Sequence, residues 1–157
     1  MRAEWDAKAA RKRSASHRTQ EHLREILIMD SVESTRAPEP VGPYPHARRA
    51  GPFLFVSGTG PRQRGSNEIP QGFEAQCRAT LDNIAAILAD AGATWDDVVD
   101  VTVFLTDMVS DFQTMNRIYA EYFKGQRPAR TTVEVTKLPT PISIEIKAVA
   151  YLANSEQ

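Results

Sequence analysis

The chain has 157 residues, of which 41% are hydrophobic and 25% are charged, and its formal net charge at pH 7 is −1. These values indicate one soluble globular domain with a tail and exclude a disordered or fibrous chain. The nearly neutral charge gives no electrostatic reason to expect nucleic acid as a partner, and no run approaches the roughly 20 apolar residues of a membrane span.

Residues 1–36 differ in composition from the rest of the chain. They are rich in Ala, Arg, Lys and Ser, but acidic residues are interspersed and no apolar segment follows, so a secretory signal is not expected. We expect a flexible or helical extension, with Met29 as an alternative start of the natural protein. An arm that docks on a neighbouring subunit is the functional alternative. Residues 37–153 then form the domain, and residues 154–157 form a C-terminal tail.

The segment that follows this extension, residues 37–45, contains too many prolines for a helix or a central strand and should run extended over the surface. Its Tyr44 either packs as an aromatic with a solvated hydroxyl or lines a pocket. Residues 46–50 and 53–57 flank a Gly-Pro pair and predict a hairpin. The S-G-T-G-P loop after it lacks the Gly-Lys-Ser/Thr ending of a P-loop, so nucleotide binding is not expected.

Residues 72–91 carry apolar side chains three and four positions apart, the pattern of a helix with one buried stripe, and Gly92 favours its end. Cys77 falls on this stripe with no histidine nearby, so we interpret it as a core thiol rather than a nucleophile. As the single cysteine of the chain it excludes an intramolecular disulfide and fits a reducing cytoplasm, the location that we expect.

A second helix is predicted over residues 111–123, where Ser110 and Gln113 form a capping-box signature. Asn116 lies beside its apolar stripe, either as a surface amide or as a side chain that reaches toward a site. Between the two helices, residues 98–106 are β-branched and apolar on both faces along part of their length. This pattern predicts a central strand.

Two alternating runs, residues 131–136 and 142–150, predict two further strands. Alternation places Arg130 and Thr132 on one face together with a glutamate, and it places Glu145 on the polar face of the second run, opposite three isoleucines. Arginine can bind a carboxylate through two hydrogen bonds, and a carboxylate held on a strand can orient a water molecule. The alternative is the ordinary solvated face of a two-stranded ribbon.

The predicted order of elements is β-β-α-β-α-β-β, an α+β fold with a single sheet. Two right-handed strand-helix-strand crossovers place both helices on one face of this sheet. A sheet with apolar side chains on both faces cannot leave the second face in water. We therefore expect oligomerisation through that face, with closed symmetry.

Residues 37–152 also contain a series of motifs, in the order A-P-E-P-V-G-P-Y, A-Q-C-R-A-T-L-D-N-I, V-V-D-V-T-V-F-L-T-D, D-F-Q-T-M-N-R-I-Y-A-E-Y-F, P-A-R-T-T-V-E-V and I-E-I-K-A-V-A. In these motifs the chain resembles the RidA family (also called YjgF/YER057c/UK114) of reactive-intermediate deaminases. The resemblance implies a chorismate-mutase-like fold and a homotrimer whose sheets form a central barrel. The active sites of such a trimer lie in the three clefts between subunits.

The resemblance also implies roles for individual residues. Arg130 matches the family arginine that binds the substrate carboxylate, and Glu145 matches the glutamate that orients the hydrolytic water. Tyr44, Ser57 and Asn116 match residues that line the same cleft. The implied reaction is the hydrolysis of a small enamine or imine acid with release of ammonia, and it needs neither a cofactor nor a metal.

Thr132 departs from the family pattern, because many members have cysteine at this position. The threonine hydroxyl can still form a hydrogen bond to a substrate. A role that needs a thiolate is excluded.

The segments P-Y-P-H-A-R-R, S-G-T-G-P-R-Q-R-G and L-P-T-P-I are similar to the branch of 2-aminomuconate deaminases of aromatic-compound catabolism. This similarity implies conversion of 2-aminomuconate to 4-oxalocrotonate (2-oxohex-3-enedioate). The substrate has a second carboxylate, for which the candidate contacts are Arg62, Arg64, His46 and Arg48. Each of them is alternatively a solvated charge.

Three other functions compete with this one. The first is a general deaminase of 2-iminobutanoate and 2-iminopropanoate, and the second is a non-catalytic ligand-binding or chaperone-like trimer. The third, a ribonuclease or translation inhibitor, is disfavoured by the net charge and by the lack of a basic aromatic surface.

Overall fold

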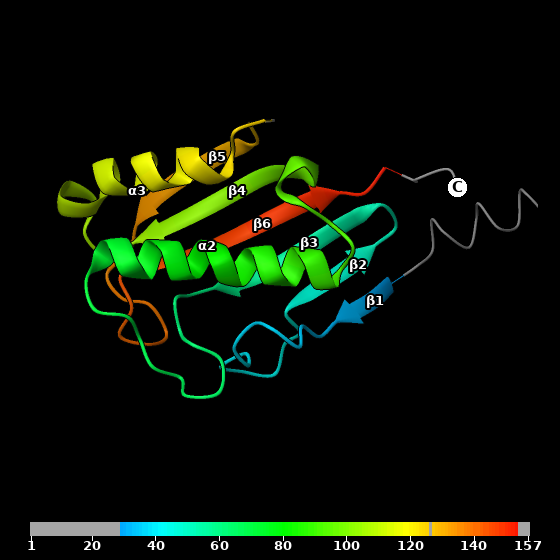
Figure 1. The fold of residues 1–157 in the computed structure, drawn as a ribbon, viewed down its shortest axis with the longest axis horizontal. Helices are drawn as coiled ribbons and strands as arrows, with labels where there is room; N and C mark the ends of the chain where they lie inside the picture. The colour runs from blue at the N-terminus through cyan, green and yellow to red at the C-terminus, as the bar shows by residue number, and fades with distance from the viewer. Residues whose placement is uncertain (1–28, 126, 154–157) are drawn as a thin grey trace, which may run out of the picture.

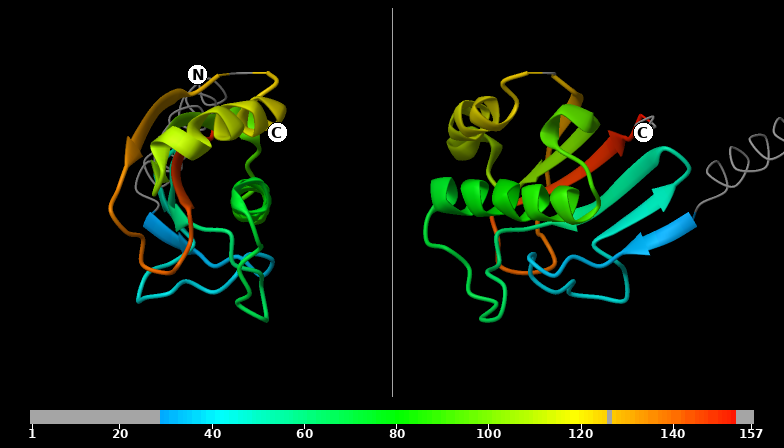
Figure 2. Two further views of the ribbon diagram at one scale, coloured as in Figure 1. Left: turned by 90° about the vertical axis from the view of Figure 1, so that its left-hand side faces the viewer. Right: turned by 45° about the vertical axis from the view of Figure 1, so that its right-hand side comes forward.

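A computed structural model describes residues 29–125 and 127–153, which form a mixed six-stranded sheet with two helices on one face (Figure 1). The left-hand view of Figure 2 shows both helices on the same side of the sheet. The elements in chain order are β1 (Met29–Val32), β2 (Ala47–Ala50), β3 (Phe53–Thr59), α2 (Phe73–Asp90), the 3-10 turn η1 (Trp95–Asp97), β4 (Val98–Leu105), α3 (Met108–Tyr122), β5 (Ala129–Glu134) and β6 (Ile144–Tyr151).

The strands lie in the order β1-β2-β3-β6-β4-β5. Strand β5 is parallel to β4, and all other neighbouring strands are antiparallel. The predicted central strand is confirmed, because β4 lies between β6 and β5. The two C-terminal strands do not form a ribbon with each other, since β4 separates them. Alternation in the sequence indicates the face on which a side chain lies but not which strand is its neighbour.

Helix α2 covers the middle of the sheet with the apolar stripe that the sequence predicts. Its inward side chains include Cys77, Leu81 and Ile84, which are completely buried against the inward residues of the strands. The helix ends at Asp90, and Gly92 beyond it has a φ of 76°, the left-handed conformation that glycine adopts at low cost. This helix therefore fixes the position of β3 and β6 beneath it.

Two boundaries differ from the predicted ones. Helix α3 begins at Met108 rather than Asp111, and its N-cap is Asp107, whose carboxylate accepts hydrogen bonds from the backbone N–H and the hydroxyl of Ser110. Aspartate is as good an N-cap as serine, so the capping-box signature that begins at Ser110 marks the first turn rather than the cap. Strand β1 was not predicted. It lies within the described part of the expected N-terminal extension and pairs with β2.

The face of the sheet away from the helices, which we call the open face, is apolar at the end formed by β3 and β6. Phe53, Phe55 and Tyr151 are each exposed by about two fifths of their surface. Their rings form one cluster, with centroids 6.3 Å apart for Phe53 and Phe55 and 5.4 Å apart for Phe53 and Tyr151. An exposed aromatic cluster on a sheet is a typical protein-protein contact surface. Within the described part of the chain, no helix is both long and apolar enough to span a membrane.

Candidate functional site

The carboxylate of Glu145 lies on the open face against strand β3. Glu145 belongs to β6 and is paired with Phe104 of β4. A Cβ built on Gly58 would come within 2.5 Å of Glu145 Oε1, so the absence of a side chain at this position makes room for the carboxylate. The pairing of β3 with β6 is irregular between Val56 and Thr59, and Gly58 lies in this irregular stretch.

The surroundings of Glu145 favour its protonated form. Burial raises the pKa of Glu145 above its ordinary value of 4.5, and no described cation offsets this effect. A carboxylate of this kind takes up a proton at a higher pH than a solvated one does. It is therefore a candidate general base.

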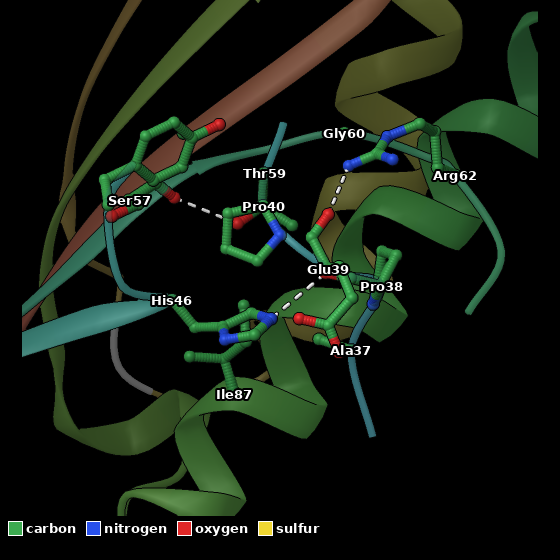
Figure 3. A pocket seen from close by; sticks show the side chains of 12 residues that line it. Ala37, Pro38, Glu39, Pro40, His46, Ser57, Thr59, Gly60, Arg62 and Ile87 are labelled. Carbon is green, nitrogen blue, oxygen red and sulfur yellow. Dashed lines mark hydrogen bonds between the residues drawn. The ribbon is translucent and has the colours of Figure 1, made fainter. Parts of the chain in front are cut away.

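A pocket opens beside Gly58, between the end of β3, helix α2 and the segment 37–46 (Figure 3). Tyr44 and Ser57, which the sequence analysis assigned to a cleft, both line it. The hydroxyl of Ser57 donates to the carbonyl of Pro45 at 2.7 Å. This bond ties β3 to the segment that carries Tyr44. The other residues of the lining are Ala37, Pro38, Glu39, Pro40, His46, Thr59, Gly60, Arg62 and Ile87.

His46 and Arg62 hold the backbone of this segment in place (Figure 3). Nδ1 of the buried His46 lies 3.1 Å from the backbone nitrogen of Ser34 and 3.2 Å from Oε2 of Glu33, and its Nε2 lies 3.0 Å from the carbonyl oxygen of Pro38. Arg62 donates to the carbonyl of Glu39 at 2.5 Å and to the side chain of Asn67. Both candidate contacts for a second carboxylate thus have structural partners.

Of these two side chains, Arg62 is partly exposed to solvent, whereas His46 is only 5% exposed. The other two candidates, Arg48 and Arg64, are exposed. Arg48 is paired with Phe55, which places it on the open face beside the aromatic cluster, and Arg64 lies in the loop before α2. Neither of these two lines the pocket.

Arg130 lies on the edge strand β5 beneath helix α3. Its Nη2 donates to Asn116 Oδ1 at 2.8 Å, and its Nη1 lies 3.8 Å from the sulfur of Met115. Its guanidinium carbon is 4.7 Å from the centroid of the Tyr119 ring. Asn116, which the sequence analysis placed either on the surface or in the site, is thus a direct partner of Arg130.

Thr132 lies two residues further along the same face of β5. Its hydroxyl oxygen is buried and has no hydrogen-bond partner among the described residues, and the same is true of the hydroxyl of Tyr119. Glu134, the third polar residue of this face, accepts a hydrogen bond from the backbone N–H of Met108 at 2.6 Å. The glutamate therefore supports the start of α3, and it is the arginine and threonine that remain candidates for ligand binding.

Within one chain, Arg130 and Glu145 lie on opposite faces of the sheet. Arg130 is paired with Val101, a buried residue of the face that the helices cover. Glu145 is paired with Phe104, whose side chain points the other way because strand side chains alternate. The chain therefore places Glu145 beside Gly58 on the open face and Arg130, with Asn116 and Thr132, on the other face. Glu145 does not itself line the pocket of Tyr44 and Ser57.

The remaining chemical candidates are structural. Cys77 is completely buried, and desolvation raises the pKa of its thiol to about 12, in agreement with the core position that the helical pattern predicts. Within residues 29–125 and 127–153, no group of three His, Cys, Asp or Glu side chains is placed to hold a metal ion.

Comparison with known proteins identifies the family of this domain. The model of the family described as Endoribonuclease L-PSP matches residues 34–152. A RutC family protein of Pyrococcus horikoshii is 50% identical over 130 residues, which are 82% of this chain and 98% of that protein. RidA of the Antarctic bacterium Psychrobacter sp. PAMC 21119 is 33% identical, with a TM-score of 0.75 over 78% of this chain and 99% of that one. The chain belongs to the RidA family.

Solved structures of RidA family members have the same fold. A Thermotoga maritima protein, provisionally described as an endoribonuclease, is 41% identical, with a TM-score of 0.77 over 81% of this chain and all of that one. Escherichia coli TdcF, solved with bound serine, is 35% identical, with a TM-score of 0.76 over 79% of this chain and 99% of that one. The expected chorismate-mutase-like fold, with a single open sheet in each chain, is confirmed.

Sequence reasoning missed two residues that shape the candidate site. Gly58 is part of the glycine-rich loop after the predicted hairpin, and nothing in the local pattern indicates that its missing side chain makes room for Glu145. Tyr119 lies in the predicted second helix at the spacing of its apolar stripe, which accounts for its partial burial but does not indicate its contact with Arg130. Both contacts join residues that are far apart in the sequence.

We expect Gly58→Ala to displace the carboxylate of Glu145 while the domain stays folded, because the atom that the new methyl group meets is the end of a flexible side chain. A crystal structure of the variant should show Glu145 rotated away from β3. Gly65→Ala is the control for a change that strains the backbone without a steric contact, since Gly65 has a φ of 85° and nothing within 4 Å, and it should leave Glu145 in place. An unmoved Glu145 in the Gly58 variant would contradict the expected packing.

Proposed function

We propose that the protein is a hydrolytic deaminase that converts small enamine or imine acids to the corresponding keto acids and ammonia. The observation that carries the proposal is the half-buried carboxylate of Glu145, whose pKa is raised by desolvation and which no described cation neutralises. The membership in the RidA family supports it, since E. coli TdcF, 37% identical over 122 residues, carries the provisional name reactive intermediate deaminase.

Glu145 can move the protons in the hydrolytic steps of this reaction. An enamine first becomes an imine by moving a proton from nitrogen to carbon. Water then adds to the imine carbon, while Glu145 takes one proton from the water and passes it to the imine nitrogen, which gives a carbinolamine. In the last step Glu145 takes the proton of the carbinol hydroxyl as the carbonyl forms and delivers it to the nitrogen, so that the C–N bond breaks and ammonia leaves.

Arg130 supplies the binding of the substrate carboxylate. A guanidinium has five N–H donors, and Asn116 accepts from only one of them, so an edge with two parallel donors remains for a carboxylate. Fixing the acid in this way would hold the neighbouring imine carbon at a constant distance from the base. Thr132, two residues along the strand, would offer its hydroxyl to the same ligand.

Because Arg130 and Glu145 lie on opposite faces of one chain, a shared ligand needs two chains. In our proposal the β5 edge of one subunit packs against the open face of the next, so that Arg130 of one copy meets Glu145 of another. The exposed aromatic cluster of Phe53, Phe55 and Tyr151 supports such an assembly. A closed ring of three subunits, as the family resemblance implies, would form three equivalent sites.

For the substrate itself we propose 2-aminomuconate, with 4-oxalocrotonate as the product. Arg62 is the best-placed contact for its second carboxylate, because it lines the same pocket as Tyr44 and Ser57. The competing candidates are 2-iminobutanoate and 2-iminopropanoate. The structure of TdcF supports these smaller substrates, because it contains bound serine, a ligand with a single carboxylate.

An assay of ammonia release from imines and enamines generated in situ separates these substrates. We expect a higher kcat/KM for 2-aminomuconate than for 2-iminobutanoate. We also expect Arg62→Gln to lower kcat/KM by about 10-fold or more for the dicarboxylate alone, since it removes a charged hydrogen-bond donor. A higher kcat/KM for 2-iminobutanoate, with an equal effect of Arg62→Gln on both, would instead identify a general imine deaminase.

Mixing two inactive variants tests whether the site is shared between chains. Arg130→Ala and Glu145→Ala should each lose activity, whereas oligomers assembled from equal amounts of both should regain it in about a quarter of their sites, which combine two intact halves. Replacing the Glu145→Ala partner by the double variant is the control and should restore nothing. A lack of recovery in oligomers shown to contain both chains would contradict a shared site.

The raised pKa of Glu145 predicts the acid side of the pH profile. A general base must be deprotonated, so kcat/KM should fall as the pH drops through the pKa of Glu145, with a midpoint above 4.5. The rate should be corrected at each pH for uncatalysed hydrolysis. Glu145→Gln should lower kcat by about 10²- to 10⁴-fold and abolish this pH dependence. A midpoint at or below 4.5 would contradict the role of Glu145 as the base.

A further inference from the structure

Three aromatic side chains follow one another behind the guanidinium of Arg130. The guanidinium lies over one face of the Tyr119 ring, with 4.7 Å between its carbon and the ring centroid. The Tyr119 ring stacks on the Phe123 ring, with centroids 4.3 Å apart and an interplanar angle of 29°. The rings of Phe123 and Trp95 pack in a T-shaped arrangement, with centroids 4.8 Å apart. Phe123 is buried, so this column joins Arg130 to the core.

Arg130 needs such support because of its place in the fold. It lies on an edge strand, is itself exposed, and has a long side chain that loses much rotational freedom when it is held in one orientation. Asn116 holds only one of its nitrogens, and the contact of the other with the sulfur of Met115 is weak. A single hydrogen bond does not fix the plane of a guanidinium.

The ring of Tyr119 fixes this plane without using any N–H donor. A cation over an aromatic face is attracted by the electrons of the ring, while the donors of the guanidinium point outward in its own plane. The edge of Arg130 that is not bonded to Asn116 therefore stays available. The stacking of Phe123 on Tyr119 in turn restricts the ring itself.

The hydroxyl of Tyr119 does not contribute to this arrangement. It is buried without a partner among the described residues, and desolvation raises its pKa to about 12, so it is neutral at physiological pH. The contact with Arg130 depends on the ring alone. Phenylalanine should therefore replace tyrosine at this position, whereas leucine should not.

We infer that Tyr119 is a positioning residue that holds Arg130 in the orientation that binds a carboxylate. The part of this inference that concerns substrate rests on the proposed function. The contact itself does not, and it can be measured in the absence of any activity.

The kinetic test compares Tyr119→Leu with Tyr119→Phe. Tyr119→Leu should raise KM by about 3- to 10-fold and change kcat by less than about 2-fold, because it weakens carboxylate binding and leaves Glu145 untouched. Tyr119→Phe should keep the KM of the wild type. An unchanged KM in Tyr119→Leu, or an equal increase in both variants, would overturn the inference.

Tyr122→Leu is the matched control for a purely structural effect. Tyr122 lies on the same helix and also contacts Trp95, with ring centroids 5.8 Å apart, but its hydroxyl donates to Asp82 and it is not in contact with Arg130. This variant should lower the melting temperature without raising KM. An increase in KM equal to that of Tyr119→Leu would show that loosening of α3, and not the loss of the ring at Arg130, is responsible.

NMR of arginine-labelled protein tests the contact independently of catalysis. Stacking on the ring should shift the Nε–H resonance of Arg130, assigned with Arg130→Lys, upfield in the wild type and in Tyr119→Phe. Absence of this shift in the wild type would overturn the inference even if Tyr119→Leu does not fold. Binding of 2-oxobutanoate, measured by calorimetry, should weaken in Tyr119→Leu by the same factor as KM.

These measurements distinguish the failure of the inference from that of the proposed function. If the wild type releases no ammonia but shows the upfield shift, and Tyr119→Leu binds 2-oxobutanoate more weakly, the deaminase proposal fails and the role of Tyr119 stands. If the wild type is an active deaminase and Tyr119→Leu has the kinetics and the binding affinity of the wild type, the role of Tyr119 fails and the deaminase stands.

Discussion

The alternation of side chains along a strand is the constraint on which the candidate site depends. Because β4 lies between β5 and β6, the pairing of the three strands assigns every side chain to a face, and it assigns Arg130 and Glu145 to different ones. No rearrangement of side chains can bring these two groups together in one subunit. The same sheet leaves the aromatic side chains of β3 and β6 exposed, so the geometry that separates the two halves also provides an apolar surface through which a second chain could join them.

The surroundings of Glu145 and of Arg130 differ in kind. On the open face, removal of water destabilises the charged form of Glu145, and Gly58 admits the carboxylate to this position. On the other face, Arg130 stays charged and is oriented by neighbours on helix α3. A base benefits from a raised pKa, whereas a binding group for an anion benefits from fixed donors. The fold thus gives each group the environment that its proposed role needs.

Much of this arrangement can be read from the sequence, and the remainder depends on contacts between distant residues. The periodicity of residues 72–91 predicts α2 almost to its ends, and alternation predicts that Glu145 and the isoleucines of β6 lie on opposite faces. Strand β1 was missed because four residues at a sheet edge carry little periodicity. The structural roles of His46 and Arg62 were missed because both side chains bind backbone carbonyls, which leave no pattern in the sequence. For the same reason both looked like candidates for a substrate contact.

The burial of Cys77 has a consequence for the reactivity of the whole protein. It is the single thiol of the chain, it lies in the core, and its high pKa leaves almost no thiolate at neutral pH. Peroxides and alkylating electrophiles therefore find no reactive sulfur of this type on the folded molecule. Oxidation or alkylation of Cys77 therefore requires an opening of the core around helix α2.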